Sequence, residues 1–287
     1  MKNKFICLIM LFILIQKMNS QDIQFYFGKV DFDNATVRLI NGKTLLGEVQ
    51  DFNSPNAVEF KNINPFNMSM SITEEIEQNL NHNRKKIKFR KSINDSFRLI
   101  PADSIDTINY FDENFNQNLE YKRLQIVRSV NGKIKETNQT LFLPVFKKDF
   151  INLYGYHLYS NGQYATTIFY LNNPKDNTAI SPYDLRFTEL FSAKKKLIER
   201  IISSYKYVSG NCPNFSKWLD DKFYDETNEI IENDYKQNYN KIRKEIKEGQ
   251  KTLKTKSEKT RFEEQKWTEY YLKTFTPAID KYKEFCK

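Results

Sequence analysis

The stretch Phe150–Leu171, FINLYGYHLYSNGQYATTIFYL, decides the fold. It consists of two runs rich in β-branched and aromatic residues, Phe150–Ser160 and Gln163–Leu171, which flank Asn161-Gly162. Asn-Gly suits a type I′ turn, because both central residues of that turn need a positive φ. The stretch therefore predicts an antiparallel β-hairpin.

Two further Asn-Gly pairs lie nearer the N-terminus and predict two more hairpins. Asn41-Gly42 joins Thr36–Ile40 to Thr44–Phe52, and Asn131-Gly132 joins Tyr121–Val130 to Lys133–Phe146. Four shorter runs also have the composition of strands: Val58–Ile63, Lys86–Ser92, Phe97–Ile100 and Thr107–Phe111. Between strands, residues 64–83 read as an insertion, in which Ser71 and Glu74 have capping-box spacing for a short helix ending at Leu80.

The pattern changes after Leu171, because Pro174 cannot donate to a sheet ladder and closes the strand run. Apolar residues then recur every three or four positions, which predicts a helix over 182–209 that begins after Ser181. Two more apolar stripes flank a polar middle that contains Gly249, and they predict a long antiparallel helical hairpin over 214–286. Pro277 should kink or end its returning helix.

These elements predict an α+β protein. An antiparallel β-rich unit over 21–171 would combine a small barrel-like hairpin with further hairpins. A helical region over 172–287 would follow it.

The first twenty residues have the layout of a cleavable secretory signal. Lys2 and Lys4 precede an apolar run of eleven residues, which is shorter than the roughly 20 that a membrane span needs. The small residue Ser20 suits a cleavage site before Gln21. We therefore expect an exported protein, periplasmic, associated with the outer envelope or secreted. An uncleaved membrane anchor is the alternative.

Without the signal, Cys212 and Cys286 are the only cysteines. They lie at the two ends of the predicted helical hairpin, and these ends meet if its arms are antiparallel. An oxidising compartment favours a disulfide between them. Two buried free thiols or an intermolecular bridge are the alternatives.

Positive charge is concentrated in the Lys-rich tip of the predicted hairpin, residues 236–261, which contains ten Lys or Arg and three Glu. This is either a solvated helix end or a site that attracts lipid headgroups or another polyanion. The candidate contacts are Lys247, Lys251, Lys254, Lys256, Lys259 and Arg261. A second basic patch lies at 84–91. Because the chain is exported, we expect no nucleic acid as a partner.

No catalytic, cofactor or metal-ligand motif is present, so the sequence assigns no catalytic or metal-ligating residue and no cofactor. His82 lies in a polar stretch. His157 is in phase with the apolar residues of its strand, which favours a packed, hydrogen-bonded side chain. A hydrolase-type enzyme is an alternative function, and a buried polar cluster around His157 in a deep pocket would favour it.

Two resemblances remain. The run from Val37 to Asp51, with Gly42 and Gly47, resembles the first motif of Sm-like small β-barrels. More broadly, Gly28-Lys29-Val30, the Gly42/Gly47 hairpin and Cys212-Pro213 resemble exported bacterial proteins of uncharacterised function, which pair a β-rich half with helices. The resemblance implies no activity. We expect a non-enzymatic binding or structural factor whose partner is unknown: another envelope protein, or an anionic surface bound through the Lys-rich tip.

Overall fold

The structure is a computed structural model that describes residues 22–25, 33–50, 57–61, 72–81, 85–112, 117–130, 133–160, 162–182, 193–229 and 235–286. The predicted signal segment, His82, the Asn131-Gly132 turn and residues 183–192 of the predicted helix lie outside this part of the chain.

Twelve strands of the described residues form one sheet. In chain order they are β1 (Asp22–Phe25), β2 (Asp33–Leu39), β3 (Thr44–Gln50), β4 (Ala57–Lys61), β5 (Lys86–Arg90), β6 (Arg98–Pro101), β7 (Ile105–Asp112), β8 (Gln117–Val130), β9 (Lys133–Lys147), β10 (Asn152–Ser160), β11 (Gln163–Asn172) and β12 (Thr178–Ile180). Most pairs are antiparallel, but β4 lies parallel to β10 and β12 parallel to β8. With the helices that follow, the sheet confirms the α+β class.

The three predicted hairpins are present as β2–β3, β8–β9 and β10–β11. Gly42 and Gly162 have φ values of +83° and +75°, as the turns require. In the first hairpin, Leu39 N–H donates to the carbonyl of Lys43 at 2.8 Å. Local turn chemistry therefore sets the strand pairing at these positions.

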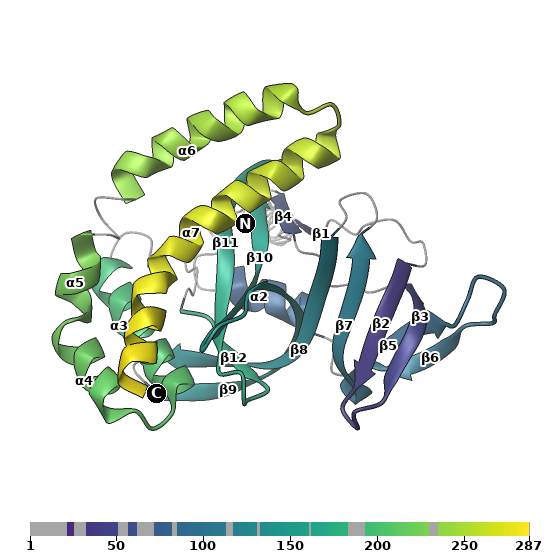
Figure 1. Ribbon diagram of the computed structural model, residues 1–287, viewed down its shortest axis with the longest axis horizontal. Helices are drawn as coiled ribbons and strands as arrows, with labels where there is room; N and C mark the ends of the chain where they lie inside the picture. The colour runs from purple at the N-terminus through teal and green to yellow at the C-terminus, as the bar shows by residue number, and fades with distance from the viewer. Residues whose placement is uncertain are drawn as a thin grey trace, which may run out of the picture.

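Strands β2, β3, β5, β6 and β7 surround a small apolar core at one end of the sheet (Figure 1). Val37, Phe89 and Ile105 are buried in it. At Gly47 the backbone of β3 approaches β5 so closely that a Cβ would collide with the carbonyl oxygen of Arg90. This close approach explains why β3 carries a glycine.

The strand run does not end at Pro174, so that prediction is wrong. The chain turns back after β11 and adds β12, which pairs with both β11 and β8. The Asn172 side-chain amide stabilises this turn, since it donates to the carbonyls of Asp176 and Thr178 at 2.9 and 2.8 Å. Ala179 and Ile180 are fully buried, and this burial compensates for the few backbone hydrogen bonds that a three-residue strand can form.

The helices are α2 (Ile72–Leu80), α3 (Ala193–Ser209), α4 (Pro213–Asp221), α5 (Phe223–Glu229), α6 (Tyr235–Gly249) and α7 (Lys256–Cys286), with short 3-10 helices at Ala102–Ser104 and Gln250–Thr252. Helix α2 confirms the short helix predicted in the 64–83 insertion. In Figure 1, α7 crosses over the sheet near β10 and β11, and α6 lies beyond it. None of the helices in the described residues is long and apolar enough to span a membrane.

The helices and the sheet share one large core. Tyr205, Phe215 and Phe275 from the helices pack in the same cluster as Leu153 and Phe169 from the sheet. The rings of Phe169 and Phe275 are 4.9 Å apart. The helical region is therefore held against the strands through buried aromatic contacts.

The outgoing arm of the helical hairpin was predicted as one helix, and this is wrong. A break at Lys222 separates α4 from α5, and α6 begins after residues 230–234, which lie outside the described part of the chain. Lys222 leaves the helical conformation with φ −130°, which turns Phe223 toward Trp218, with ring centroids 5.7 Å apart. Burial of these large rings in the shared core outweighs the continuity of a straight helix. Only α6 and α7 remain as the long antiparallel pair.

Pro277 does not end the returning helix, because α7 continues to Cys286. Hydroxyl groups bond carbonyls in the turn before it: Thr276 Oγ1 donates to the carbonyl of Leu272 at 3.1 Å, and Tyr205 Oη donates to that of Phe275 at 3.4 Å. The next turn buries Ala278 and Ile279 completely. Packing after the proline therefore overrides its intrinsic cost.

Candidate functional site

The base of the helical hairpin is closed by the predicted disulfide between Cys212 and Cys286. The bond joins the residue before α4 to the last residue of α7, and the two Cα atoms are 5.8 Å apart. Phe215 follows Cys212 by three residues and Tyr282 precedes Cys286 by four, and the centroids of their rings are 5.3 Å apart. The intramolecular bridge is thus favoured over free thiols and over an intermolecular bond.

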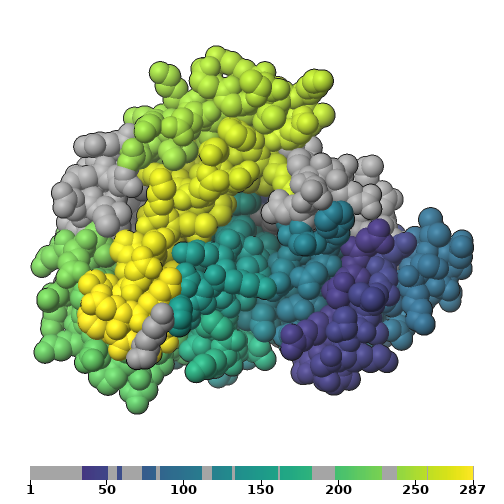
Figure 2. All heavy atoms as spheres, viewed as in Figure 1, coloured from purple at the N-terminus to yellow at the C-terminus, as the bar shows by residue number. Residues whose placement is uncertain are grey.

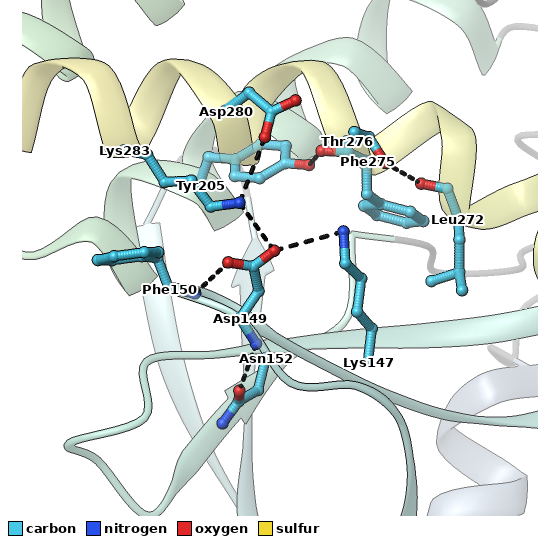
Figure 3. A network of polar contacts seen from close by, with 10 residues as sticks. All are labelled: Lys147, Asp149, Phe150, Asn152, Tyr205, Leu272, Phe275, Thr276, Asp280 and Lys283. Carbon is cyan, nitrogen blue, oxygen red and sulfur yellow. Dashed lines mark hydrogen bonds and ion pairs between the residues drawn. The ribbon is translucent and has the colours of Figure 1, made fainter.

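An ionic cluster ties the same end of α7 to the sheet (Figure 3). The Asp149 carboxylate, in the turn between β9 and β10, accepts from Lys283 Nζ at 3.0 Å and pairs with Lys147 Nζ at 3.4 Å. It also accepts the N–H of Phe150 at 2.8 Å. Burial alone would raise the pKa of Asp149, but these hydrogen bonds together hold it below its ordinary value.

The middle of the hairpin is held by an aromatic stack that reaches from α6 to the sheet. The Trp267 ring of α7 lies 5.0 Å from that of Tyr239 in α6 and 5.2 Å from that of Tyr164 in β11. The Tyr164 and Trp267 rings are nearly parallel, with 4° between their planes. This stack fixes the direction in which the two helices leave the body of the protein.

The turn between α6 and α7 is compact. The Phe262 ring packs so closely on Gly249 that a Cβ there would collide with it unless the ring moved. The Gln250 side-chain amide donates to the carbonyl of Lys259 at 3.1 Å. Thr255 and Glu258 form a capping box at the start of α7, with Thr255 Oγ1 accepting from Glu258 N–H at 3.1 Å and the carboxylate accepting from Thr255 N–H at 2.7 Å.

The predicted basic residues all lie at this turn or on the adjoining ends of the two helices. Lys247, Lys251, Lys254 and Lys256 are exposed, whereas Lys259 and Arg261 are partly covered. Lys251 forms an ion pair with Glu248 at 2.7 Å. The capping hydrogen bonds lower the pKa of Glu258. Figure 2 shows this end of α6 and α7 at the margin of the molecule.

His157 is the packed, hydrogen-bonded residue that its strand position predicted. Its Nδ1 lies 2.9 Å from Thr167 Oγ1, which is also 2.6 Å from the hydroxyl of Tyr164. The Phe146 ring covers the imidazole at 5.3 Å. Burial lowers the pKa of His157 to about 3, so the ring is neutral near pH 7. A polar cluster thus surrounds His157, but the imidazole is enclosed by protein and serves packing.

A buried carboxylate beside this cluster was not identified from the sequence. Glu264 of α7 accepts a hydrogen bond from the Tyr159 hydroxyl of β10 at 3.2 Å. Burial raises the pKa of Glu264 to about 7, against the opposing effect of that hydrogen bond. The sequence signal was its position three residues before Trp267, on the face of α7 that meets the sheet.

Because of the Glu264 carboxyl group, we expect the free energy of unfolding to depend on pH. The pKa of this carboxyl is about 7 in the folded protein, against a value near 4.5 in the unfolded chain. The group therefore stabilises the fold fully below pH 4.5, and this stabilisation is lost as the pH rises through about 7. We expect Glu264→Gln to become more stable relative to wild type across this window, by at most about 1.4 kcal/mol per pH unit. Urea unfolding of both proteins at several pH values measures the difference. Glu269→Gln, at an exposed position of α7, should show no such trend.

A second buried charge cluster anchors α2 and was also missed. Glu77 pairs with Arg128 of β8 and accepts the hydroxyl of Tyr170 at 2.7 Å. Glu74 lies 3.9 Å from the same guanidinium. Nothing local in the 64–83 insertion could reveal this cluster, because the partners of Glu77 are 51 and 93 positions away.

Among the described residues, no group of three or more His, Cys, Asp or Glu side chains is arranged to hold a metal ion. No protein-family model matches the chain, and no curated protein or solved structure matches it at a significant level. The α6–α7 turn, with its exposed lysines, is therefore a candidate site identified from the geometry and charge of this chain alone.

Proposed function

We propose that this chain is an exported, non-enzymatic binding protein that contacts an anionic surface through the tip of its helical hairpin. The observation that carries the proposal is the charge of that tip. Residues 236–261 have a net charge of +7, while the whole chain has +9. The remaining 261 residues are close to neutral, so the tip dominates the long-range field of the protein.

The chemistry of the tip suits a diffuse polyanion. Eight of its ten cations are lysines, which act as strongly hydrated point charges and do not impose a bidentate geometry. Binding of this kind is electrostatic and weakens as salt screens the charges, with a Debye length of about 10 Å at 0.1 M. Lipid headgroups and anionic envelope polymers both offer such a surface.

The hairpin also holds the tip in place before binding. The close approach of Phe262 to Gly249 and the stack on Trp267 join α6 to α7 and to the sheet, and the capping box at Thr255 fixes the start of α7. A preorganised site loses less conformational entropy on binding than a free chain does. The Cys212–Cys286 bridge is consistent with export, because disulfides persist in oxidising compartments.

Salt-dependent retention on a heparin column tests the proposal. We expect the wild-type protein to bind at low salt, and the variant with glutamine at Lys251, Lys254, Lys256 and Lys259 to elute at clearly lower salt. The matched control replaces four exposed lysines elsewhere with glutamine and has the same net charge: Lys43, Lys133, Lys135 and Lys217. Equal loss in both variants, or no retention of wild type at low salt, would exclude the tip as the binding site.

A further inference from the structure

The β5–β6 hairpin, at the opposite end of the sheet from the helices, exposes large apolar side chains. Ile93, Phe97 and Leu99 are 70%, 53% and 51% exposed, although most large apolar residues of the described chain are covered. In Figures 1 and 2 this blue hairpin forms the right-hand margin of the molecule, and its loop projects beyond the neighbouring strands. Apolar side chains at such a projecting loop are a candidate contact surface.

The loop is a formed turn. Asp95 N–H donates to the carbonyl of Ser92 at 3.0 Å, and Ser92 Oγ donates to the Asp95 carboxylate at 2.8 Å. Arg90 Nη1 donates to the carbonyl of Ile93 at 3.4 Å. The inner face of the hairpin is already filled by core residues, including Phe89. The exposed side chains are thus presented outward by a structured hairpin.

Positive charge accompanies these apolar groups. Residues 85–101 contain six Lys or Arg and a single acidic residue, Asp95. Arg90 is paired with Glu48. Lys88 Nζ lies 5.4 Å from the ring centroid of Phe97, so cation and aromatic ring share one face of the hairpin. Apolar residues beside lysines on a projecting element are typical of segments that lie in a membrane interface.

We propose that the β5–β6 hairpin seats on an anionic lipid bilayer, with Ile93 and Phe97 entering the boundary between headgroups and acyl chains. Lys86, Lys88 and Lys91 would contact the anionic headgroups. The inference rests on the proposed function, because it names the anionic surface as lipid and adds a second contact to the basic tip.

A lipid surface fits this hairpin better than a protein strand does. Strand β6 is the last strand of the sheet among the described residues, but it is only four residues long and ends at Pro101. A short edge strand that ends in proline and carries a charged side chain, here Arg98, disfavours pairing with another strand. The few apolar side chains of a projecting loop can be buried in a deformable apolar layer that lies beneath charged headgroups. A bilayer supplies such a layer.

Vesicle co-sedimentation of the full protein tests the inference. The vesicles are phosphatidylcholine alone, or phosphatidylcholine mixed with phosphatidylglycerol. We expect wild type to bind only the anionic vesicles, and Ile93→Ser with Phe97→Ser to bind them about tenfold more weakly or worse, since burial of each side chain is lost. The control, Ile134→Ser with Tyr224→Ser, removes side chains that are 37% and 42% exposed elsewhere and should bind like wild type.

The heparin column separates this inference from the proposed function, because heparin has no apolar layer. Loss of vesicle binding by the Ile93/Phe97 variant with unchanged heparin retention supports the hairpin contact. Vesicle binding equal to wild type overturns it and leaves the tip proposal standing. Failure of the tip on heparin, with hairpin-dependent vesicle binding intact, overturns the proposed function alone.

A spectroscopic measurement keeps the inference testable even if the double variant folds poorly. Phe97→Trp places an indole at the loop, whereas the two native tryptophans, Trp218 and Trp267, are already buried. We expect the added emission to shift to the blue with phosphatidylglycerol vesicles and to remain unchanged with phosphatidylcholine alone. No shift under conditions where the protein sediments with the vesicles would overturn the hairpin as the contact.

Discussion

Replacing both Cys212 and Cys286 with serine is expected to lower the free energy of unfolding by about 4.5 kcal/mol. The bridge joins positions 74 residues apart, so it removes many conformations from the unfolded chain. In the chain-entropy description this restriction raises the free energy of the unfolded state. Urea unfolding of the oxidised protein and of the variant, monitored by far-UV circular dichroism, measures the difference.

The matched control is wild-type protein unfolded with a thiol reductant, which should give the same midpoint as the serine variant. The m-value should rise when the bridge is absent, because the unfolded chain then exposes more surface. A loss below about 1 kcal/mol would contradict the expectation. It would mean that the unfolded chain is already restricted near these residues, for example by the aromatic contacts of Phe215 and Tyr282.

Arg128→Met is expected to destabilise the protein by about 3–5 kcal/mol. The side chain of Glu77 is 1% exposed, and Arg128 is its counter-charge. Removing the guanidinium leaves the buried carboxylate without this counter-charge, although the Tyr170 hydroxyl still donates to it at 2.7 Å. An uncompensated buried charge is costly because water no longer solvates it. Thermal and urea unfolding at pH 7 measure the loss.

A double variant separates the charge effect from simple loss of packing. Adding Glu77→Gln to Arg128→Met removes the buried charge and keeps the shape of the side chain, so part of the lost stability should return. If the double variant is no more stable than Arg128→Met, the loss comes from the packing of the arginine stem. Helix α2 would then be held chiefly by Ile76 and Leu80, which are buried in the core beneath it.

The elements that could be predicted from the sequence are those set by short-range chemistry. Asn-Gly pairs predicted three hairpins because the conformation of a tight turn depends on its own residues, and the strands that flank each pair are antiparallel. The Cys212–Cys286 bridge followed from two cysteines at the ends of one helical pattern. The Lys-rich tip was predicted as well, because apolar periodicity stops between two amphipathic segments. Its capping box at Thr255 and Glu258 is a local signal that could also have been recognised.

The tertiary structure alone decided the features that depend on distant partners. Strand β12 enters between β11 and β8, and α7 passes through Pro277, because burial of Ile180 and Ile279 outweighs the local preference of the chain. The pairing of Glu77 with Arg128 spans 51 positions, and that of Glu264 with Tyr159 spans 105. The sequence by itself determined the turns, the helices' apolar faces and the charge of the tip. It could not determine which polar groups become buried together, because that depends on where remote segments meet in space.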